Sequence, residues 1–330
     1  MTTNNHVRKP VAGLAWPWRL LQIAVTVGLI AYILYKVPFV DAWTAVLQAR
    51  VLYLGLATLS LAAVYLTFIF RWHLLLRPIG VTHSFIHTLG LGLIAIFYNN
   101  FMPSTLGGDA AKSYLVARGH DIPAPQVVAS VVTDRSLGLA ALLIMGFAAS
   151  FAISVPGIRE LLLALVAAAL VFALLVIWIA RAGGARPASS PGPERASWLA
   201  AILRKASETA QALIHYRKHK FHLAAGVVIS CLGIVVAGLT LKLWCLAFGF
   251  DLSLVEAIAI TLATSVVTMI PITVNGLGLA EGTSIVLLAA AGLGKPEALA
   301  VAILQRVVVA LLGLLGGALQ FSPRPYRPTF

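Results

Sequence analysis

The sequence predicts an all-α polytopic membrane protein with two inverted structural halves, each containing a re-entrant helical hairpin broken by Pro and Gly. Three observations favour this class. The 330 residues are 60% hydrophobic and only 11% charged, so several apolar stretches are long enough to cross a bilayer. The basic residues lie mainly between these stretches, as topology signals do. Pro and Gly interrupt two of the stretches, at corresponding places in the two halves.

The charge of the chain favours lipid over nucleic acid as a partner. Lys and Arg number 24 against 11 Asp and Glu, which gives a formal net charge of +13. Nucleic-acid binding would need these cations gathered on a soluble surface, whereas they lie between apolar stretches. Membrane lipids with anionic headgroups are therefore the expected partners. A lipid-synthesising enzyme is a further candidate partner, and the oligomeric state is left open.

Nine apolar segments are expected to be helical. They lie near 20–37, 52–76, 84–102, 127–153, 158–180, 221–249, 254–271, 279–292 and 297–320. Basic residues precede the first segment, as in a signal peptide, but it is long and no small-residue cleavage site follows, so we expect a retained anchor helix. The polar connections comprise an amphipathic link over 37–50, a linker rich in Gly, Pro and Ser over 181–197, and an amphipathic helix over 198–218 on the cytoplasmic leaflet.

The distribution of basic residues predicts the topology. Nine simple crossings would leave the two ends on opposite sides, whereas the basic N-terminus, the segment 181–220 and the basic tail should all be cytoplasmic. The conflict disappears if 84–118 forms a hairpin that enters from the cytoplasmic side and 254–292 forms one that enters from outside. Irregular backbone at membrane depth must be covered by protein or a wet cavity, so the two tips should face one another. We expect a multi-pass protein of the cell inner membrane with both termini cytoplasmic.

The chain is expected to be one integral membrane domain, 1–330, built as a repeat. Half one covers about 18–153, half two about 158–322, and the cytoplasmic linker about 181–220. Both halves contain a proline, a glycine five residues later, then an acid, and an arginine in the following long segment. These are Pro103, Gly108, Asp109 and Arg135 in half one, and Pro271, Gly276, Glu281 and Arg306 in half two. Inverted repeats with interrupted helices indicate an alternating-access transport site.

Four motifs carry a resemblance to a known family: NNFMPSTLGGDAAKSYLVARG from 99, TDRSLGL at 133–139, PITVNGLGLAEG from 271 and LQR at 304–306. Together they resemble the lysylphosphatidylglycerol synthase transmembrane region, a family of flippase-like integral membrane proteins. In bifunctional members a soluble aminoacyl-transferase domain follows the membrane part, whereas this chain stops at Phe330, so the resemblance implies no synthase activity here. Lys112 departs from the family pattern, in which arginine is more usual, and so lacks the bidentate fork.

The resemblance and the repeat together predict a lipid flippase or transporter. The expected cargo is an anionic or modified lipid (aminoacyl, hopanoid-type or polyprenyl-linked), carried across the bacterial inner membrane. The alternatives are a non-transporting envelope scaffold and a membrane-embedded lipid headgroup transferase. Enzyme motifs such as GxxxxGK, HExxH and GxSxG are absent from the sequence, so we expect no enzyme, no cofactor and no metal.

Charged and polar residues near the two predicted tips are the site candidates, because an anionic headgroup at the bilayer midplane needs charge-assisted bonds. The substrate-binding or gating candidates are Asn99, Asn100, Asp109, Lys112, Asp134, Arg135, Asn275, Glu281 and Arg306. The candidates for hairpin-tip backbone are Pro103, Gly107, Gly108, Pro271, Gly276 and Gly278.

A structural reading of the same charges stays open. Asp109 is a helix N-cap candidate, and Lys112, three residues on, can neighbour it on one helix face. Asp134 and Arg135 are adjacent, so they point to different faces of a helix and each needs another partner. Ion pairs between the halves, such as Arg135 with Glu281 or Arg306 with Asp109, would then brace the fold without serving transport.

Overall fold

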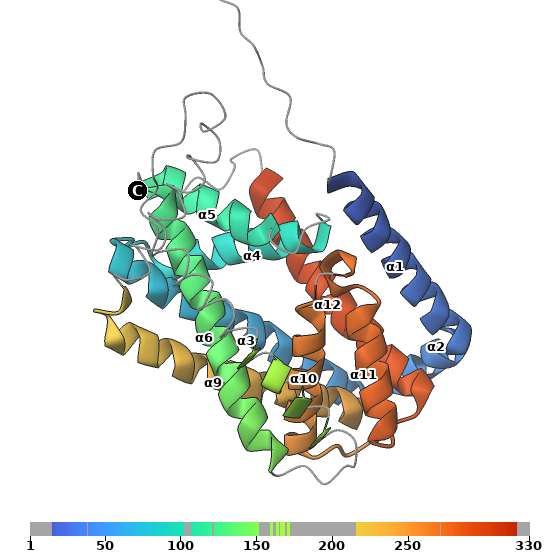
Figure 1. Cartoon of the computed structure of the whole chain (residues 1–330). Coiled ribbons are helices and arrows are strands. Elements are labelled where there is room, and N and C mark those ends of the chain that lie inside the picture. The colour runs from blue at the N-terminus through green and yellow to red at the C-terminus, as the bar shows by residue number, and fades with distance from the viewer. Residues whose placement is uncertain are drawn as a thin grey trace, which may run out of the picture.

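The computed structural model describes residues 15–37, 39–101, 107–120, 122–151, 216–270 and 272–321, with scattered helical residues between 159 and 171. In these ranges the regular elements are helices (Figure 1). Four helices are long and apolar enough to cross a membrane: α3 (Val51–Leu76), α6 (Ala124–Ser150), α9 (Lys220–Ala247) and α12 (Lys295–Phe321). A fifth span arises if α1 (Ala15–Lys36) and α2 (Phe39–Gln48), bent by 70° at their junction, count as one. The predicted all-α polytopic class is confirmed.

Two pairs of short helices occupy the places where hairpins are predicted. In half one, α4 (Phe85–Phe101) packs against α5 (Gly107–His120), and in half two α10 (Leu254–Thr268) packs against α11 (Leu279–Ala290). These helices have between 12 and 17 residues, which gives lengths of about 18–26 Å, shorter than a hydrocarbon core of about 30 Å. Such lengths suit re-entrant arms.

The predicted helices agree with the described ones to within a few residues. The amphipathic link over 37–50 contains α2, which carries an acid in its first turn. Most of segment 158–180, the whole linker 181–197 and nearly all of the amphipathic stretch 198–218 lie outside the described residues, as do Pro103 and Pro271 of the two tips. The expectations for these parts stay predictions.

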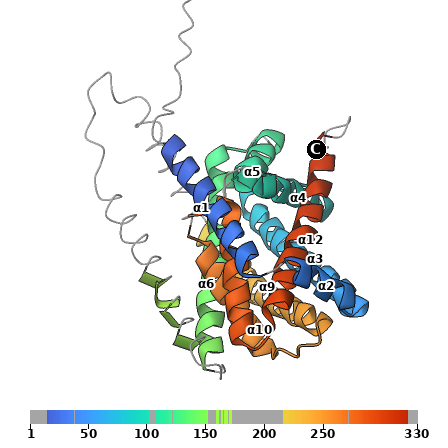
Figure 2. The same cartoon turned by 90° about the vertical axis from the view of Figure 1, so that its right-hand side faces the viewer.

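Several helices that the predicted repeat would equate lie in contact with one another or with each other's neighbours. The repeat equates α3 with α9, and these two pack along each other. It equates α4 with α10 and α6 with α12, and the structure packs α4 on α12 and α10 on α6. Two perpendicular views place α4 and α5 toward one end of the bundle and α10 toward the other (Figures 1 and 2). The repeat, and the inverted orientation of its two halves in a membrane, stay predictions.

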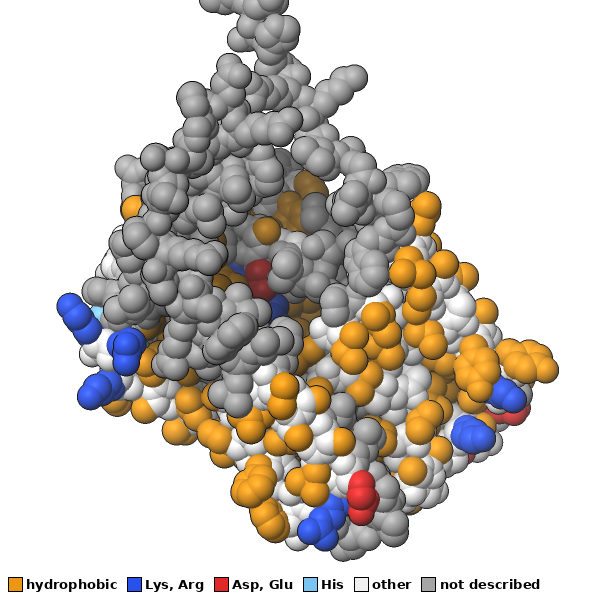
Figure 3. All heavy atoms as spheres, in the orientation of Figure 1, with side chains coloured by type: hydrophobic (Ala, Val, Ile, Leu, Met, Phe, Trp, Pro, Cys, Tyr) orange, Lys and Arg blue, Asp and Glu red, His pale blue; other side chains and the backbone are white. Residues whose placement is uncertain are grey.

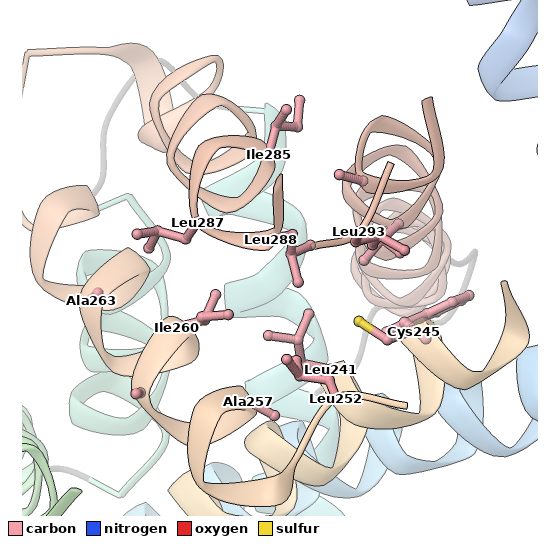
Figure 4. Close-up of a cluster of buried hydrophobic side chains, with 14 of the residues drawn as sticks. Leu241, Cys245, Leu252, Ala257, Ile260, Ala263, Ile285, Leu287, Leu288 and Leu293 are labelled. Atoms are coloured by element: carbon pink, nitrogen blue, oxygen red, sulfur yellow. The ribbon is translucent and has the colours of Figure 1, made fainter. Parts of the chain in front are cut away.

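The largest buried core holds the second hairpin against its neighbours. Leu241 and Cys245 of α9, Ile260 of α10 and Leu288 of α11 are fully or almost fully buried and point toward one another (Figure 4). Burying aliphatic side chains of this size stabilises by roughly 1.5–3 kcal/mol each in water. Within a bilayer the gain comes from close packing. This core holds α11 in place, and with it Glu281 in the first turn of that helix.

Candidate functional site

Asp109 lies between two cations at the start of α5. Its Oδ1 atom is 2.9 Å from Nζ of Lys112, three residues along the same helix. Its Oδ2 atom accepts from Nε of Arg135 at 3.0 Å and from Nη2 at 2.7 Å, across from α6. The side chains of Asp109 and Lys112 are only 10% and 12% exposed, whereas that of Arg135 is 61% exposed. This cluster therefore combines a shielded acid with an accessible arginine.

Glu281 repeats this arrangement in the second hairpin, in the first turn of α11. Its Oε1 atom accepts from Nε of Arg306 at 2.7 Å and also from Nη2. Its Oε2 atom accepts from the backbone N–H of Gly278 at 2.7 Å. The two acid–arginine pairs have nearly equal sequence separations, 26 and 25 residues. In each half, the acid at the start of the outgoing hairpin arm thus binds the arginine of the following long helix.

The alternative pairings named from the sequence are wrong. Arg135 binds Asp109 and not Glu281, and Arg306 binds Glu281 and not Asp109. Each pair stays within its own half because the hairpin arm and the next long helix are consecutive and packed together. The prediction that Lys112 neighbours Asp109 on one helix face is confirmed.

Figure 3 shows an acidic side chain beside basic ones, set back from the outer surface of the molecule. Arg306 is 30% exposed and its partner Glu281 is 15% exposed, so the second pair is less accessible than Arg135. A partly buried charge inside a membrane protein costs several kcal/mol unless it is paired. This cost accounts for the short hydrogen bonds between Glu281 and Arg306.

One asparagine of α4 joins the two arms of the first hairpin, and a neighbouring asparagine holds α12. Asn99 Oδ1 accepts from the backbone N–H of Gly108 at 2.9 Å, one of the N–H groups that a helix start leaves unpaired. A Cβ on Gly108 would lie 2.3 Å from a backbone oxygen of α4, so the close approach of the two arms requires glycine. Gly107 begins α5. Asn100 Nδ2 donates to the Val309 carbonyl of α12 at 3.0 Å. Both asparagines thus have structural bonds.

The second tip is built from left-handed backbone. Asn275, Gly276 and Gly278 have φ values of 50°, 70° and 79°. Asparagine and glycine are the residues that tolerate this region. The tip is tied to α1 because the Val274 N–H donates to Thr26 Oγ1 at 3.0 Å. Asn275 therefore has a conformational role that is sufficient to explain its presence.

Asp134 has a partner that sequence reasoning missed. Arg71 of α3 donates to its two carboxylate oxygens from Nε at 2.7 Å and from Nη2 at 2.9 Å, while Nη1 donates to Ser230 Oγ of α9 at 2.8 Å. The Arg71 and Asp134 side chains are 8% and 9% exposed. An arginine near the end of the apolar segment 52–76 also fits a topology signal, although an ionised side chain inside such a segment indicates a buried partner. This buried pair braces α3, α6 and α9.

Lys112 is held by a second contact besides Asp109. Its Nζ atom lies 4.6 Å from the centroid of the Trp72 ring, in the position of a cation–π interaction. Trp72 is 2% exposed, and its indole N–H donates to Ser130 Oγ at 3.2 Å. Lys112 is therefore a fixed member of the cluster.

The described residues offer no metal centre, since no three of their His, Cys, Asp or Glu side chains are placed to hold an ion. They do bring together the buried pair of Arg71 with Asp134 and two further acid–arginine pairs, each joining a hairpin to the next long helix. The pair of the first hairpin carries an additional lysine.

These helices and paired charges define the class: a multi-pass membrane protein with charged clusters inside its helix bundle. Residues 19–317 match the model of the lysylphosphatidylglycerol synthase TM region, so the chain belongs to that family. The resemblance stated from the motifs is thereby confirmed.

Two archaeal relatives align with nearly the whole chain. A UPF0104 membrane protein of Methanothermobacter thermautotrophicus is 24% identical over 317 residues, which cover 88% of this chain and 90% of the relative. A UPF0104 membrane protein of Pyrococcus horikoshii is 22% identical over 327 residues, covering 93% and 97% respectively. Neither name states a substrate or a reaction.

Proposed function

We propose that this protein moves an anionic or modified lipid between the two leaflets of its membrane. The observation that carries the proposal is the duplicated acid–arginine pair, Asp109 with Arg135 and Glu281 with Arg306, at the starts of the outgoing arms of the two hairpins. Membership of a family defined by the transmembrane part of a lipid-modifying enzyme supports a role with membrane lipids.

The physical requirement for such a role is a path for the headgroup. The acyl tails of a lipid stay in hydrocarbon throughout the movement, but the phosphate must cross a region where an unpaired charge costs several kcal/mol. Arginine donors compensate this cost with charge-assisted bonds, and helix starts at the hairpin arms add positive dipole ends. Two such positions in opposite halves would serve the headgroup in turn, which is the logic of alternating access.

The lipids that co-purify with the protein test the proposal. Native mass spectrometry would compare the wild type with an Arg135→Gln, Arg306→Gln variant whose helical content and monodispersity are unchanged. We expect the wild type to retain a defined anionic or aminoacylated lipid that the variant loses. If both carry the same bulk lipid, the arginines are braces, and the scaffold alternative replaces transport.

The transferase alternative predicts a different result. A headgroup transferase would convert the co-purified lipid when a donor is supplied, so its product would appear as a mass shift in the same spectra. We expect the lipid mass to stay constant, because transport moves the lipid without changing its covalent structure.

A further inference from the structure

The cluster around Asp109 has more positive charge than its acid can neutralise. Lys112 and Arg135 supply two positive charges and Asp109 supplies one negative charge, so the cluster has a net charge of +1. The pair of Glu281 and Arg306 has one charge of each sign and is neutral. An anion is therefore attracted more strongly to the first hairpin than to the second.

The two cations of the first cluster differ in how firmly they are held. Lys112 is on the same helix as Asp109, is 12% exposed and lies over the buried Trp72 ring. Arg135 comes from another helix, α6, is 61% exposed and forms an ion pair with Asp109. If Arg135 turns away, Asp109 keeps its bond to Lys112 at 2.9 Å and is not left as an unpaired buried charge. Of the two cations bound to Asp109, Arg135 is thus the one that can leave the carboxylate for another anion.

The geometry of the bond also suits exchange. Arg135 presents Nε and Nη2 to a single carboxylate oxygen. The same edge of a guanidinium binds the two unesterified oxygens of a phosphodiester in a bidentate way. A phosphodiester can therefore replace Asp109 with no loss of hydrogen bonds to Arg135.

We propose that Arg135 takes up the phosphodiester of an anionic lipid, and that Asp109 is its resting partner, which Lys112 retains while Arg135 is bound to the lipid. The inference deepens the proposed function and rests on it for the lipid as the source of the phosphodiester. Asp109 then acts as an internal competitor that is displaced by the headgroup and returns after the headgroup leaves.

The decisive variant removes the competitor at constant charge. In an Asp109→Asn, Lys112→Met double variant, Arg135 alone remains and the cluster keeps its net charge of +1. Affinity would be measured by native mass spectrometry of protein released from nanodiscs in which the fraction of phosphatidylglycerol in phosphatidylcholine is titrated. We expect the double variant to bind phosphatidylglycerol at least about fivefold more tightly than the wild type, because no carboxylate competes for Arg135.

Matched controls separate the site from general charge effects. Arg135→Gln should weaken phosphatidylglycerol binding at least about tenfold, both in the wild type and in the Asp109→Asn, Lys112→Met variant. The reason is that the charge-assisted pair between the arginine and the phosphodiester is lost. Arg118→Gln removes an exposed arginine further along α5, and Asp251→Asn breaks an ion pair of a 78% exposed acid with Lys242. The affinity of both control variants for phosphatidylglycerol should stay within about twofold of that of the wild type. If the double variant does not fold, Asp109→Asn alone also removes the competitor, and its affinity is then compared with that of Asp251→Asn, which changes the charge of the protein by the same amount.

Two outcomes would overturn the inference. The first is a folded Asp109→Asn, Lys112→Met variant that binds phosphatidylglycerol no more tightly than the wild type. The second is competition by soluble glycerophosphoglycerol or by inorganic phosphate at the concentration of the lipid, which would remove the lipid as the source. If binding follows the expected pattern but vesicles show no lipid movement, the proposed function fails and the assignment of Arg135 stands. If the Asp109→Asn and the Arg135→Gln variants each move lipid as fast as the wild type, the assignment of Arg135 fails and the proposed lipid transport stands.

Discussion

Removing Asp134 should destabilise the fold far more than removing an exposed acid. The Asp134 carboxylate receives two bonds from Arg71, at 2.7 and 2.9 Å, and both side chains are less than one tenth exposed. An Asp134→Leu variant leaves the guanidinium buried without its counter-charge, in contact with the Ser230 hydroxyl and the Phe68 ring. We expect a loss of about 3–5 kcal/mol in the free energy of unfolding, the range for breaking a buried ion pair from one side.

The assay is reversible unfolding in mixed detergent micelles, followed by helical content. An Arg71→Met, Asp134→Leu double variant removes both charges and should lose much less stability than the single variant, within about 1.5 kcal/mol of the wild type. The control Asp251→Asn breaks an exposed pair and should cost no more than about 1 kcal/mol. The reasoning would be refuted if Asp134→Leu matched the control, or if the double variant were as unstable as the single one.

Gly278→Ala should lower stability by about 1–3 kcal/mol, because φ is 79° and the added Cβ would lie 2.8 Å from Leu29. Gly282→Ala, where the nearest side-chain atom is 3.6 Å away, should be nearly neutral in the same unfolding assay. Burial, and then the neighbouring His120, His73, His87 and Arg77, lower the pKa of His83 to about 4. The neutral form therefore stabilises the fold fully above about pH 6.5, and this contribution is lost as the pH falls toward 4. Melting temperatures at pH 7.5 and 5.0 should differ less in His83→Gln than in the wild type; an equal difference would contradict this.

The helices could be predicted from the sequence because their signals are local. Apolar segments, the Pro and Gly interruptions and the amphipathic link are each visible within a short window, and α4, α10, α11 and α2 lie where these signals place them. The neighbouring positions of Asp109 and Lys112 were also predictable, because residues three apart in a helix share a face.

The pairing of the remaining charges could not be derived in this way. Two hairpin acids and two arginines can be paired in more than one way, and only the packing of each hairpin arm on the next helix decides in favour of Asp109 with Arg135. Arg71 was missed because a single arginine near the end of an apolar segment also fits a topology signal. Likewise, the sequence gives no sign that Trp72 would lie beside Lys112, since the contact joins α3 to α5.

Lipid movement in reconstituted vesicles tests the central claim most directly. Fluorescently labelled phosphatidylglycerol would be placed in both leaflets, and the fraction that an external quencher reaches would be followed with time, with labelled phosphatidylcholine as the neutral-charge control. We predict faster quenching of the phosphatidylglycerol pool with the wild type, and the rate of protein-free vesicles with the folded Arg135→Gln, Arg306→Gln variant. Equal rates for wild-type and protein-free vesicles, with phosphatidylglycerol and with the aminoacylated form of the same lipid, would contradict a transport role for the two acid–arginine pairs.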